Sequence, residues 1–419
     1  MKYLKPRGTA DVYGNEAKIF KKIENIVLET GKLNGFSEIK TPIFESANLF
    51  IRSIGETSDI VKKEFYIFKD KSDRELALRP ENTAGVVRAV VEEKMLNKIP
   101  TPIKLMYVGP MFRYERPQSG RYRQFDQFGC EIIGTESIYD DVDCLVLGTQ
   151  ILDTIGIKNY TLSINNIGNF ETRKKWVDAL KKYLSKYKNE LSDLSKERLI
   201  SNPLRILDDK VDGKKGFIKN APKIIDFLSD DEKNKQKILE ESLKKLKIKF
   251  IVDEKLVRGL DYYTNLVFEF NVDNSSAILA GGRYGKLMKE IGGPDVGCIG
   301  FAMGMQRIML LLEEQNKKII DDQDIDVLLL LLDEKYAIES LNLLKELREN
   351  GISAICKFDQ NKIEKGFSYA KLVNAKSVIL LGKNEINSGK YTIKNQKNMK
   401  QEKIDKKNII KYISDKIKK

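Results

Sequence analysis

One short stretch constrains the fold more than any other: residues 104–134 read KLMYVGPMFRYERPQSGRYRQFDQFGCEIIG. The apolar and small residues up to Gly109 predict one strand, and residues 122–133 predict a second. The loop between them is rich in Arg, Pro and Gly, so we predict an antiparallel hairpin. Such a hairpin directs alternate side chains to one face and holds them in register. Its arginines are Arg113, Arg116, Arg121 and Arg123.

The side chains of this hairpin indicate a phosphate-binding site. Arg presents a rigid fork of donors that can hold two phosphate oxygens at once. Tyr and Phe residues alternate with the arginines, and Glu115 and Glu131 add carboxylates. The alternative is a solvated basic hairpin, but a purely solvated loop has no need for aromatic residues in two facing strands. We therefore interpret the hairpin as part of a ligand site.

The hairpin resembles motif 2 of the class II aminoacyl-tRNA synthetases, and FRYERPQSGRYRQFDQFGCE is similar to the histidyl-tRNA synthetase version of that motif. Other segments resemble the same family in the family's order and nearly end to end, most weakly over residues 170–249. These segments are LALRPENT (76–83, the amino-acid-binding turn), LVRGLDYYTNLVFEF (256–270, the histidine signature), AGGRYGKL (280–287, a second signature), GCIGFAMGMQRIMLLL (297–312, motif 3) and GFSEIKTPIFE (35–45, the place of motif 1, the dimer motif).

The resemblance implies an α+β catalytic domain with an antiparallel sheet, which we assign to residues 1–324. Dense Lys, Asp and Ser with helical periodicity predict a helical insertion at about residues 171–249. Residues 313–324 are polar and suit a linker, and alternating strand and helix patterns then predict an α/β domain over residues 325–419. By resemblance this second domain is an anticodon-binding domain.

Local patterns predict the individual elements. Residues 15–34 have apolar side chains at helical spacing and stop at Gly35, which predicts an amphipathic helix. Further helices are predicted at 84–96 and 140–155, and strands at 38–44, 65–68, 160–164 and 256–272. In the last domain, strands are predicted at 327–332, 352–358 and 377–381, and helices at 336–350, ended by Gly351, and at 363–373.

Composition adds limits on partners and location. The formal net charge of the 419 residues is +13, and residues 326–419 hold 20 Lys and Arg against 12 Asp and Glu. This surplus favours a nucleic-acid contact, although a lysine-rich genome composition also explains part of it. The four cysteines lack CxxC spacing and there is no histidine, so no Cys/His zinc site or disulfide framework is expected. We expect no signal peptide, no membrane span and a cytoplasmic protein.

The absence of histidine also limits the chemistry. A mechanism with a His general base is excluded, but activation of an amino acid needs none, because the attacking carboxylate is already an anion. Two explanations of the missing histidine stay open. A protein that charges tRNA with histidine could then be made while histidyl-tRNA is scarce, and compositional drift explains the same fact.

The resemblance also implies the reaction and its phosphate contacts. L-Histidine would be activated with ATP, with Mg²⁺ held mainly through the ATP phosphates, and transferred to tRNA(His) by a homodimer. Arg113 and Arg258 would flank the α-phosphate as the catalytic residues, and both are also assigned to histidine binding. Arg121 and Arg307 would hold the outer phosphates, so ATP would contact Arg113, Arg121 and Arg307. No protein side chain is predicted to bind a metal.

The residues predicted to bind histidine must provide a polar pocket, because a neutral imidazole carries one donor and one acceptor. Glu131 can accept from the ring, and Tyr263 can bond its other side. The α-ammonium group suits Glu81, Thr83 and Gln127, and the pocket also includes Asn82 and Tyr262. Adjacent strand residues face opposite sides, so one of Tyr262 and Tyr263 is expected to be core.

Some further positions carry expectations of their own. By resemblance, Arg116 and Gln118 lie near the tRNA acceptor end. Gly281 and Gly282 are expected to allow close approach of the backbone to the ligand, with a plain bulge as the alternative. The sequence departs from the usual family pattern at Asn82, Gly285, Lys286 and Gln306, where Gly or Met, Asp, Gly and Glu are commoner. These departures affect fine geometry and leave the proposed phosphate and imidazole contacts in place.

Two other protein classes compete with this interpretation. The regulatory subunit of ATP phosphoribosyltransferase shares the catalytic fold and binds histidine as a sensor, but that family usually lacks the anticodon domain and parts of the arginine set. A plain RNA-binding protein would have no use for an ordered imidazole pocket. An exchange assay between ATP and pyrophosphate separates both from a synthetase.

Overall fold

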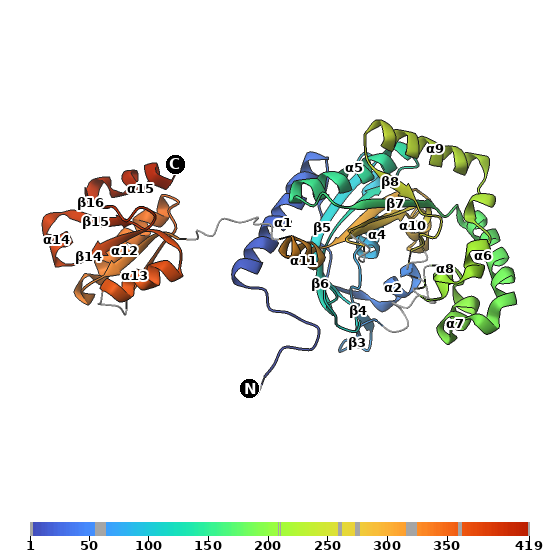
Figure 1. Cartoon of the computed structure of the whole chain (residues 1–419), viewed down its shortest axis with the longest axis horizontal. Coiled ribbons are helices and arrows are strands. Elements are labelled where there is room, and N and C mark those ends of the chain that lie inside the picture. The colour runs from blue at the N-terminus through green and yellow to red at the C-terminus, as the bar shows by residue number, and fades with distance from the viewer. Residues whose placement is uncertain are drawn as a thin grey trace. The chain divides into compact units, whose positions relative to one another are not determined.

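The computed structural model describes residues 3–54, 64–207, 209, 211–258, 262–272, 277–315, 325–358 and 363–417. The chain divides into two compact units, Met1–Lys317 and Lys318–Lys419 (Figure 1). Most of the linker predicted at 313–324 lies outside the described residues. The domain boundary at residue 324 therefore stays a prediction.

The larger unit is built on a mixed sheet whose strand order, within the described residues, is β1-β5-β6-β11-β10-β9-β7-β8. The strands are β1 (Ser37–Glu38), β5 (Ile103–Phe112), β6 (Gln124–Ile133), β7 (Thr161–Asn166), β8 (Phe250–Val252), β9 (Thr264–Asn271), β10 (Leu279–Arg283) and β11 (Cys298–Gly304). From β5 to β7 all neighbours are antiparallel, whereas β1 and β8 pair parallel at the two edges. The expected antiparallel sheet is confirmed, with a parallel strand added at each edge.

The predicted hairpin is confirmed. Strands β5 and β6 pair from Ile103 opposite Ile133 to Phe112 opposite Gln124. The first strand continues past Gly109 because the antiparallel ladder continues without a break. The strand predicted at 38–44 is wrong: β1 joins the large sheet, and β2 (Phe44–Ser46) joins a small sheet with β4 (Glu75–Leu78) and β3 (Ile67–Lys69).

Helices cover both faces of the large sheet (Figure 1). A side chain added at Gly31 of α1 (Gly14–Leu33) would meet Met106, whereas the neighbouring Tyr107 packs with valines of α4 (Thr83–Glu92). Adjacent strand residues point to opposite faces, so α1 and α4 lie on opposite sides. The other helices here are α2 (Ala47–Ile54), η1 (Met95–Asn97), α5 (Ile138–Ile155), α10 (Lys286–Glu290) and α11 (Met305–Glu314).

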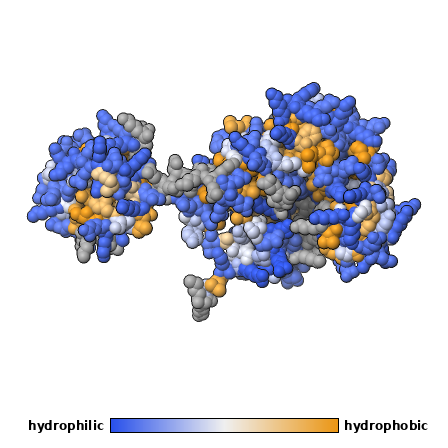
Figure 2. All heavy atoms as spheres, in the orientation of Figure 1, coloured by the Kyte–Doolittle hydropathy of each residue, from blue (hydrophilic) through white to orange (hydrophobic). Residues whose placement is uncertain are grey.

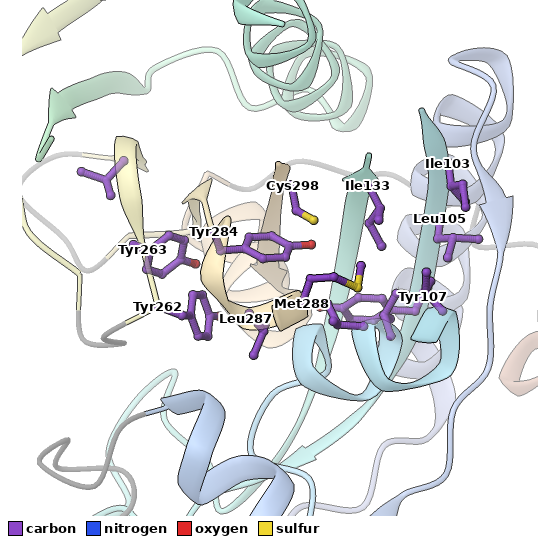
Figure 3. Packing of buried hydrophobic residues seen from close by; sticks show 14 of the residues in the cluster. Ile103, Leu105, Tyr107, Ile133, Tyr262, Tyr263, Tyr284, Leu287, Met288 and Cys298 are labelled. Atoms are coloured by element: carbon purple, nitrogen blue, oxygen red, sulfur yellow. The ribbon is translucent and has the colours of Figure 1, made fainter. Parts of the chain in front are cut away.

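The core on the α4 side leads to the site. Figure 3 shows Leu105 and Tyr107 of β5 near α4, and Leu287 of α10 beside Tyr262. At one side of this cluster lie Tyr262, Tyr263 and Tyr284. The ring of Tyr262 lies 4.6 Å from that of Tyr263 and 5.7 Å from that of Tyr284, between centroids. The apolar core therefore continues directly into a group of side chains with polar tips.

The helical insertion lies between β7 and β8. Its core is formed around Trp176, Leu180 and Ile206, all buried. This part of the expected fold is confirmed as helical, while its bounds stay a prediction. Its elements are α6 (Phe170–Leu184), η2 (Ser185–Glu190), α7 (Asp193–Ser201), α8 (Leu204–Leu207), η3 (Asp212–Lys214), η4 (Gly216–Asn220), η5 (Ile224–Asp226) and α9 (Asp230–Lys245).

The smaller unit is an α/β domain, as predicted. Its sheet has the order β13-β12-β14-β15-β16 within the described residues, with β13, β12 and β14 parallel and β15 and β16 antiparallel. Gly351, with φ of +74°, follows α12 as the expected helix-ending glycine. The elements are β12 (Ile325–Leu331), η6 (Glu334–Tyr336), α12 (Ala337–Glu349), β13 (Ala354–Lys357), α13 (Ile363–Leu372), β14 (Ala375–Leu381), α14 (Lys383–Ser388), β15 (Lys390–Asn395), β16 (Gln401–Asp405), η7 (Lys406–Asn408) and α15 (Ile409–Ile417).

The surface of each unit is mainly hydrophilic. Figure 2 shows hydrophilic residues over most of the visible face of both units, interrupted by smaller hydrophobic areas. Across the described ranges, we find no helix with the length and apolar character needed to cross a bilayer.

Candidate active site

A cavity of about 490 Å³ lies over the large sheet of the larger unit. It is lined from the hairpin, from the turn before α4, from the start of α11 and from β9, β10 and β11 with the residues before them. It brings together most of the predicted site residues, namely Glu81, Thr83, Arg113, Arg121, Gln127, Glu131, Arg258, Tyr262, Tyr263 and Arg307. Segments distant in sequence therefore meet at one place, as the family resemblance implied.

Glu131 of β6 lines the cavity and is surrounded there by the polar side chains of Thr83 and Tyr284. Its carboxylate is 1% exposed and accepts hydrogen bonds from Thr83 Oγ1, at 2.9 Å, and from the Tyr284 hydroxyl. Burial raises the pKa of Glu131 to about 8, although the two hydroxyl donors oppose that shift. The Glu131 carboxyl is therefore mainly protonated at neutral pH, and it can pass a proton to an imidazole or form a hydrogen bond with it.

Gly300 provides the room for this carboxyl. It lies opposite Glu131 in the β6–β11 ladder and also lines the cavity. A Cβ added at Gly300 would overlap the Glu131 carboxylate and the carbonyl oxygen of Cys130. Glycine at this position is therefore required by the close packing of the pocket floor.

Glu81 has a structural partner as well as a place in the cavity. Its two carboxylate oxygens accept from the backbone N–H of Thr83, at 2.6 Å, and of Ala84, at 3.0 Å, at the start of α4. Burial raises the pKa of Glu81, while these hydrogen bonds lower it. Asn82 differs from its neighbours: its Oδ1 accepts from Thr41 Oγ1, at 2.6 Å, and the residue is not part of the cavity lining among the described residues. Its role in histidine binding stays a prediction.

Four of the arginines that line the cavity were predicted from the sequence, and each of these four has a partner that sets its position. Arg113 Nε donates to the Pro80 carbonyl at 2.8 Å, and Arg121 Nη1 lies 3.6 Å from a Glu115 oxygen. Arg258 pairs with Glu269 of β9. Arg307 donates to the carbonyl of residue 277 from the first turn of α11.

The positive charges of these arginines favour the binding of an anionic ligand. Burial lowers the pKa of Arg307, and so do the neighbouring cations Arg121 and Arg113. For Arg258, burial also opposes the charged form, but Glu269 and the two tyrosines together outweigh burial, and the pKa is raised. A group of like charges held close together in a cavity is stabilised when an anionic ligand enters. The arrangement therefore suits a chain of phosphates.

One of Tyr262 and Tyr263 was expected to be core and the other to face the ligand, but the two are not divided in this way, because both belong to the buried cluster and both line the cavity. Strand β9 begins only at Thr264, so the two tyrosines precede the strand and do not alternate across it. Both rings line the cavity, and they are 5% and 7% exposed. The rest of the signature between them and Arg258, residues 259–261, lies outside the described residues.

The expectation that Gly281 and Gly282 allow close approach to a ligand is corrected, and the alternative of a bulge fits. A Cβ at Gly281 would collide with the backbone of β11, and one at Gly282 with the Leu266 carbonyl and the Tyr263 ring. The ladder between β10 and β9 shifts register between Gly282 and Arg283. These glycines permit tight packing between strands rather than contact with the cavity.

Arg116 and Gln118 lie in the loop of the hairpin and are not among the residues that line the cavity. Both are exposed, and an isolated bridge joins Gln118 to Arg121 at the tip of the loop. An exposed loop beside the cavity can meet a large substrate, so their contact with the tRNA acceptor end stays a prediction.

Some cavity residues were missed by the sequence reasoning. Tyr284 and Gly300 line the cavity and lie inside segments that were quoted for the family resemblance. Their place in those segments was the sequence signal that could have identified them. Arg205 comes from α8 of the insertion, the region where the resemblance is weakest. Gln306 lines the cavity, and its amide bonds Asp126 twice: Nε2 donates to the carboxylate at 2.9 Å, and Oε1 accepts from the backbone N–H at 2.8 Å.

These contacts explain one departure from the family pattern. A glutamate at position 306 would place a second carboxylate against Asp126, whereas the amide of Gln306 can donate to it. Lys286 lies 3.1 Å from the centroid of the Phe170 ring, which gives it a cation–π contact with the insertion. Nothing in the structure explains Gly285.

Comparison with known proteins agrees with this geometry. The family model described as "Histidyl-tRNA synthetase" matches residues 8–308, and the one described as "Anticodon binding domain" matches residues 326–416. A histidine–tRNA ligase of Ureaplasma parvum is 47% identical, over 96% of this chain and 97% of its own, and one of Lactobacillus johnsonii is 42% identical, over 94% of each chain. The crystal structure of apo histidyl-tRNA synthetase from S. aureus has a TM-score of 0.84 and 35% identity, covering 98% of this chain and 99% of its own.

These matches confirm the class expected from the sequence, including the anticodon-binding domain at the C-terminal end. They extend over nearly the whole chain and agree with the hairpin, the signatures and the arginines that meet in the cavity. The chain belongs to the histidyl-tRNA synthetase family of class II aminoacyl-tRNA synthetases.

Proposed function

We propose that this chain attaches L-histidine to tRNA(His) in two steps, through a histidyl-adenylate. The observation that carries the proposal is one cavity lined by the four predicted arginines and by the buried Glu131 carboxyl. The arginines suit the triphosphate of ATP, and the carboxyl suits an imidazole ring. A site for ATP alone would not need the buried carboxyl, and a site for histidine alone would not need the group of arginines.

In the first step an oxygen of the histidine carboxylate attacks the α-phosphorus of ATP. A bond forms between this carboxylate oxygen and the α-phosphorus. The bond from the α-phosphorus to the oxygen that bridges the α- and β-phosphates breaks, and pyrophosphate leaves. Negative charge gathers on the α-phosphate and on the leaving group, so preorganised cations lower the barrier. Arg113 and Arg258 serve the α-phosphate, and Arg121 and Arg307 serve the outer phosphates.

In the second step a terminal hydroxyl of the tRNA attacks the carbonyl carbon of the adenylate, and AMP leaves. The chain contains no histidine, so the proton of that hydroxyl passes to another acceptor. A phosphate oxygen of the adenylate is chemically suited to receive it, because it becomes more basic as AMP departs.

Histidine is selected by the polar side chains in the part of the cavity around Glu131. Glu131 bonds one ring nitrogen, and the Tyr263 hydroxyl bonds the other. Glu81, Thr83 and Gln127 contact the α-ammonium group. The Oε1 atom of Gln127 is buried without a hydrogen-bond partner, which supports a ligand donor at that point. An amino acid without a matching side chain would leave these groups unpaired and would be rejected.

Mg²⁺ is proposed to act with ATP. Glu115 and Glu269 place carboxylate oxygens, the type of ligand that Mg²⁺ prefers, on the cavity wall. Both carboxylates already face arginines, so phosphate oxygens would supply most of the ligands of the ion. When bound, Mg²⁺ would neutralise part of the phosphate charge.

The partners of the chain follow from the two units. The basic smaller unit is proposed to bind the anticodon arm of tRNA(His), and the exposed hairpin loop with Arg116 and Gln118 to meet the acceptor end. A homodimer is supported by exposed aromatic residues on the small sheet: Phe44 is 52% and Phe68 is 41% exposed, with ring centroids 6.2 Å apart. We expect the protein to act in the cytoplasm.

The test is exchange between ATP and labelled pyrophosphate with the full chain and each of the twenty amino acids. We expect exchange with histidine alone, and transfer of histidine to tRNA(His) in the presence of ATP. Histidine binding without any exchange would instead support the sensor function of the ATP phosphoribosyltransferase regulatory subunits. Sedimentation of the same preparation measures the dimer.

A further inference from the structure

The helical insertion packs directly against the segment that carries Arg258. Val257, the residue before it, is 5% exposed and belongs to the same buried cluster as Trp176 and Ile206 of the insertion. Val257 also lines the cavity. One side chain therefore contributes both to the core of the insertion and to the wall of the active site.

Polar contacts reinforce this packing just before Val257. Lys223 of the insertion forms an ion pair with Glu254 at 2.7 Å, and Lys255 Nζ donates to the Gly213 carbonyl at 3.3 Å. Surface ion pairs of this kind contribute little energy each. They nevertheless show that the chain segment just before Arg258 contacts the insertion at several neighbouring residues.

The insertion also contacts the other end of the histidine signature. Arg173, in the first turn of α6, donates from Nη1 to the backbone carbonyl of Tyr263 at 2.6 Å. A hydrogen bond from a charged donor is about twice as strong as a neutral one. It fixes the peptide that follows Tyr263, whose ring lines the cavity and packs at 4.6 Å from that of Tyr262.

The backbone of Arg173 is itself held in place. Asn169 caps α6 by accepting from the Thr172 N–H at 2.9 Å. The buried carboxylate of Glu232, from α9, accepts from the Asn169 N–H at 2.7 Å and from Thr172 Oγ1 at 3.0 Å. The start of α6 is thus tied to α9, so the Arg173 side chain extends toward Tyr263 from a rigid base.

We propose that the insertion positions the histidine pocket, and that Arg173 is the positioning residue that holds Tyr263 in its orientation toward the cavity. This inference rests on the proposed function, because it needs Tyr263 to contact the bound histidine. It assigns the insertion a part in the first step of the reaction, before any tRNA is present.

The test compares Arg173→Met with the matched control Lys174→Met in the full chain. Both changes remove one positive charge from the same turn of α6, but Lys174 is exposed. Histidine-dependent exchange gives KM for histidine, KM for ATP and kcat. We expect Arg173→Met to raise the histidine KM about tenfold and to change the ATP KM less than about twofold. Arg173→Lys, which keeps one donor, should recover part of the loss, and Lys174→Met should match the parent.

An unchanged histidine KM in Arg173→Met overturns the inference. So does an equal rise in both KM values, or a fall in kcat alone, because a merely structural role would act in those ways. If Arg173→Met fails to fold by circular dichroism, Arg173→Gln is judged by the same criteria. A parent chain without histidine-dependent exchange refutes the proposed function and this inference together, whereas an active parent with an unaffected Arg173→Met refutes the inference alone.

Discussion

Replacing Glu131 by Gln is expected to stabilise the protein against unfolding, measured without added histidine, while weakening histidine binding. Burial raises the pKa of Glu131 from 4.5 to about 8 in the folded chain. Between these values the folded state keeps a proton that the unfolded state has released. The contribution of this group to stability is therefore fully present below pH 4.5 and is lost as the pH rises to about 8.

The size of the effect follows from that shift. At pH 7, about 2.5 units above the unfolded pKa, the lost stability is roughly 3 kcal/mol at about 1.4 kcal/mol per unit. Glutamine has the same shape and stays neutral, so it avoids this cost. The hydroxyls of Thr83 and Tyr284 both donate to Glu131. In a glutamine side chain only the amide oxygen can accept a hydrogen bond, because the amide nitrogen only donates. Rearranging one of these hydrogen bonds costs about 1 kcal/mol, which leaves a net gain of about 2 kcal/mol at pH 7.

Urea unfolding of both proteins at several pH values measures this difference. The single tryptophan, Trp176, is buried in the insertion, so its fluorescence reports the larger unit. The gain of Glu131→Gln should be near zero at pH 5 and grow to roughly 3 kcal/mol at pH 8. A gain that does not depend on pH would refute the raised pKa of Glu131.

The same variant tests the pocket. Replacing a carboxyl by an amide should raise the histidine KM strongly and change the ATP KM little, because Glu131 is not among the residues proposed to contact the phosphates. Equal losses for both ligands would mean that Glu131 has only a structural part.

Three further predictions concern other parts of the molecule. Arg258→Ala should lower histidine-dependent exchange about 10²-fold or more, because a preorganised cation is lost at the α-phosphate; near-normal exchange by a folded variant would rule out that role. Gly300→Ala should cost more than about 2 kcal/mol in thermal or urea unfolding, since its methyl group would overlap Glu131, and a stability equal to the parent would contradict the packing of the pocket floor. The fragment 1–324, if it dimerises, should retain exchange but charge tRNA with a raised KM and bind it with a shallower salt dependence; charging at the parent's KM would defeat the anticodon assignment.

Much of the fold could be predicted from local sequence patterns. The hairpin of β5 and β6, helix α1 and the alternating elements of the smaller unit all follow from periodicity and turn residues, because each pattern acts within a short stretch of chain. Strands of two or three residues, such as β1 and β2, could not be predicted reliably in this way. Their pairing depends on a partner strand far away in sequence, and a short stretch contains no periodicity that reveals it.

The sequence by itself determined which chemical groups are available: arginines on a hairpin, a carboxyl at Glu131, no histidine, and a basic C-terminal unit. Only the tertiary structure decided how those groups behave. Burial raises the pKa of Glu131, and close packing requires glycine at position 300. Because β9 starts only after Tyr263, both Tyr262 and Tyr263 can face the cavity. The tertiary structure also brought Arg173 of the insertion to the carbonyl of Tyr263. Solvation, proximity and orientation depend on neighbours far away in the chain, and folding alone brings those neighbours together.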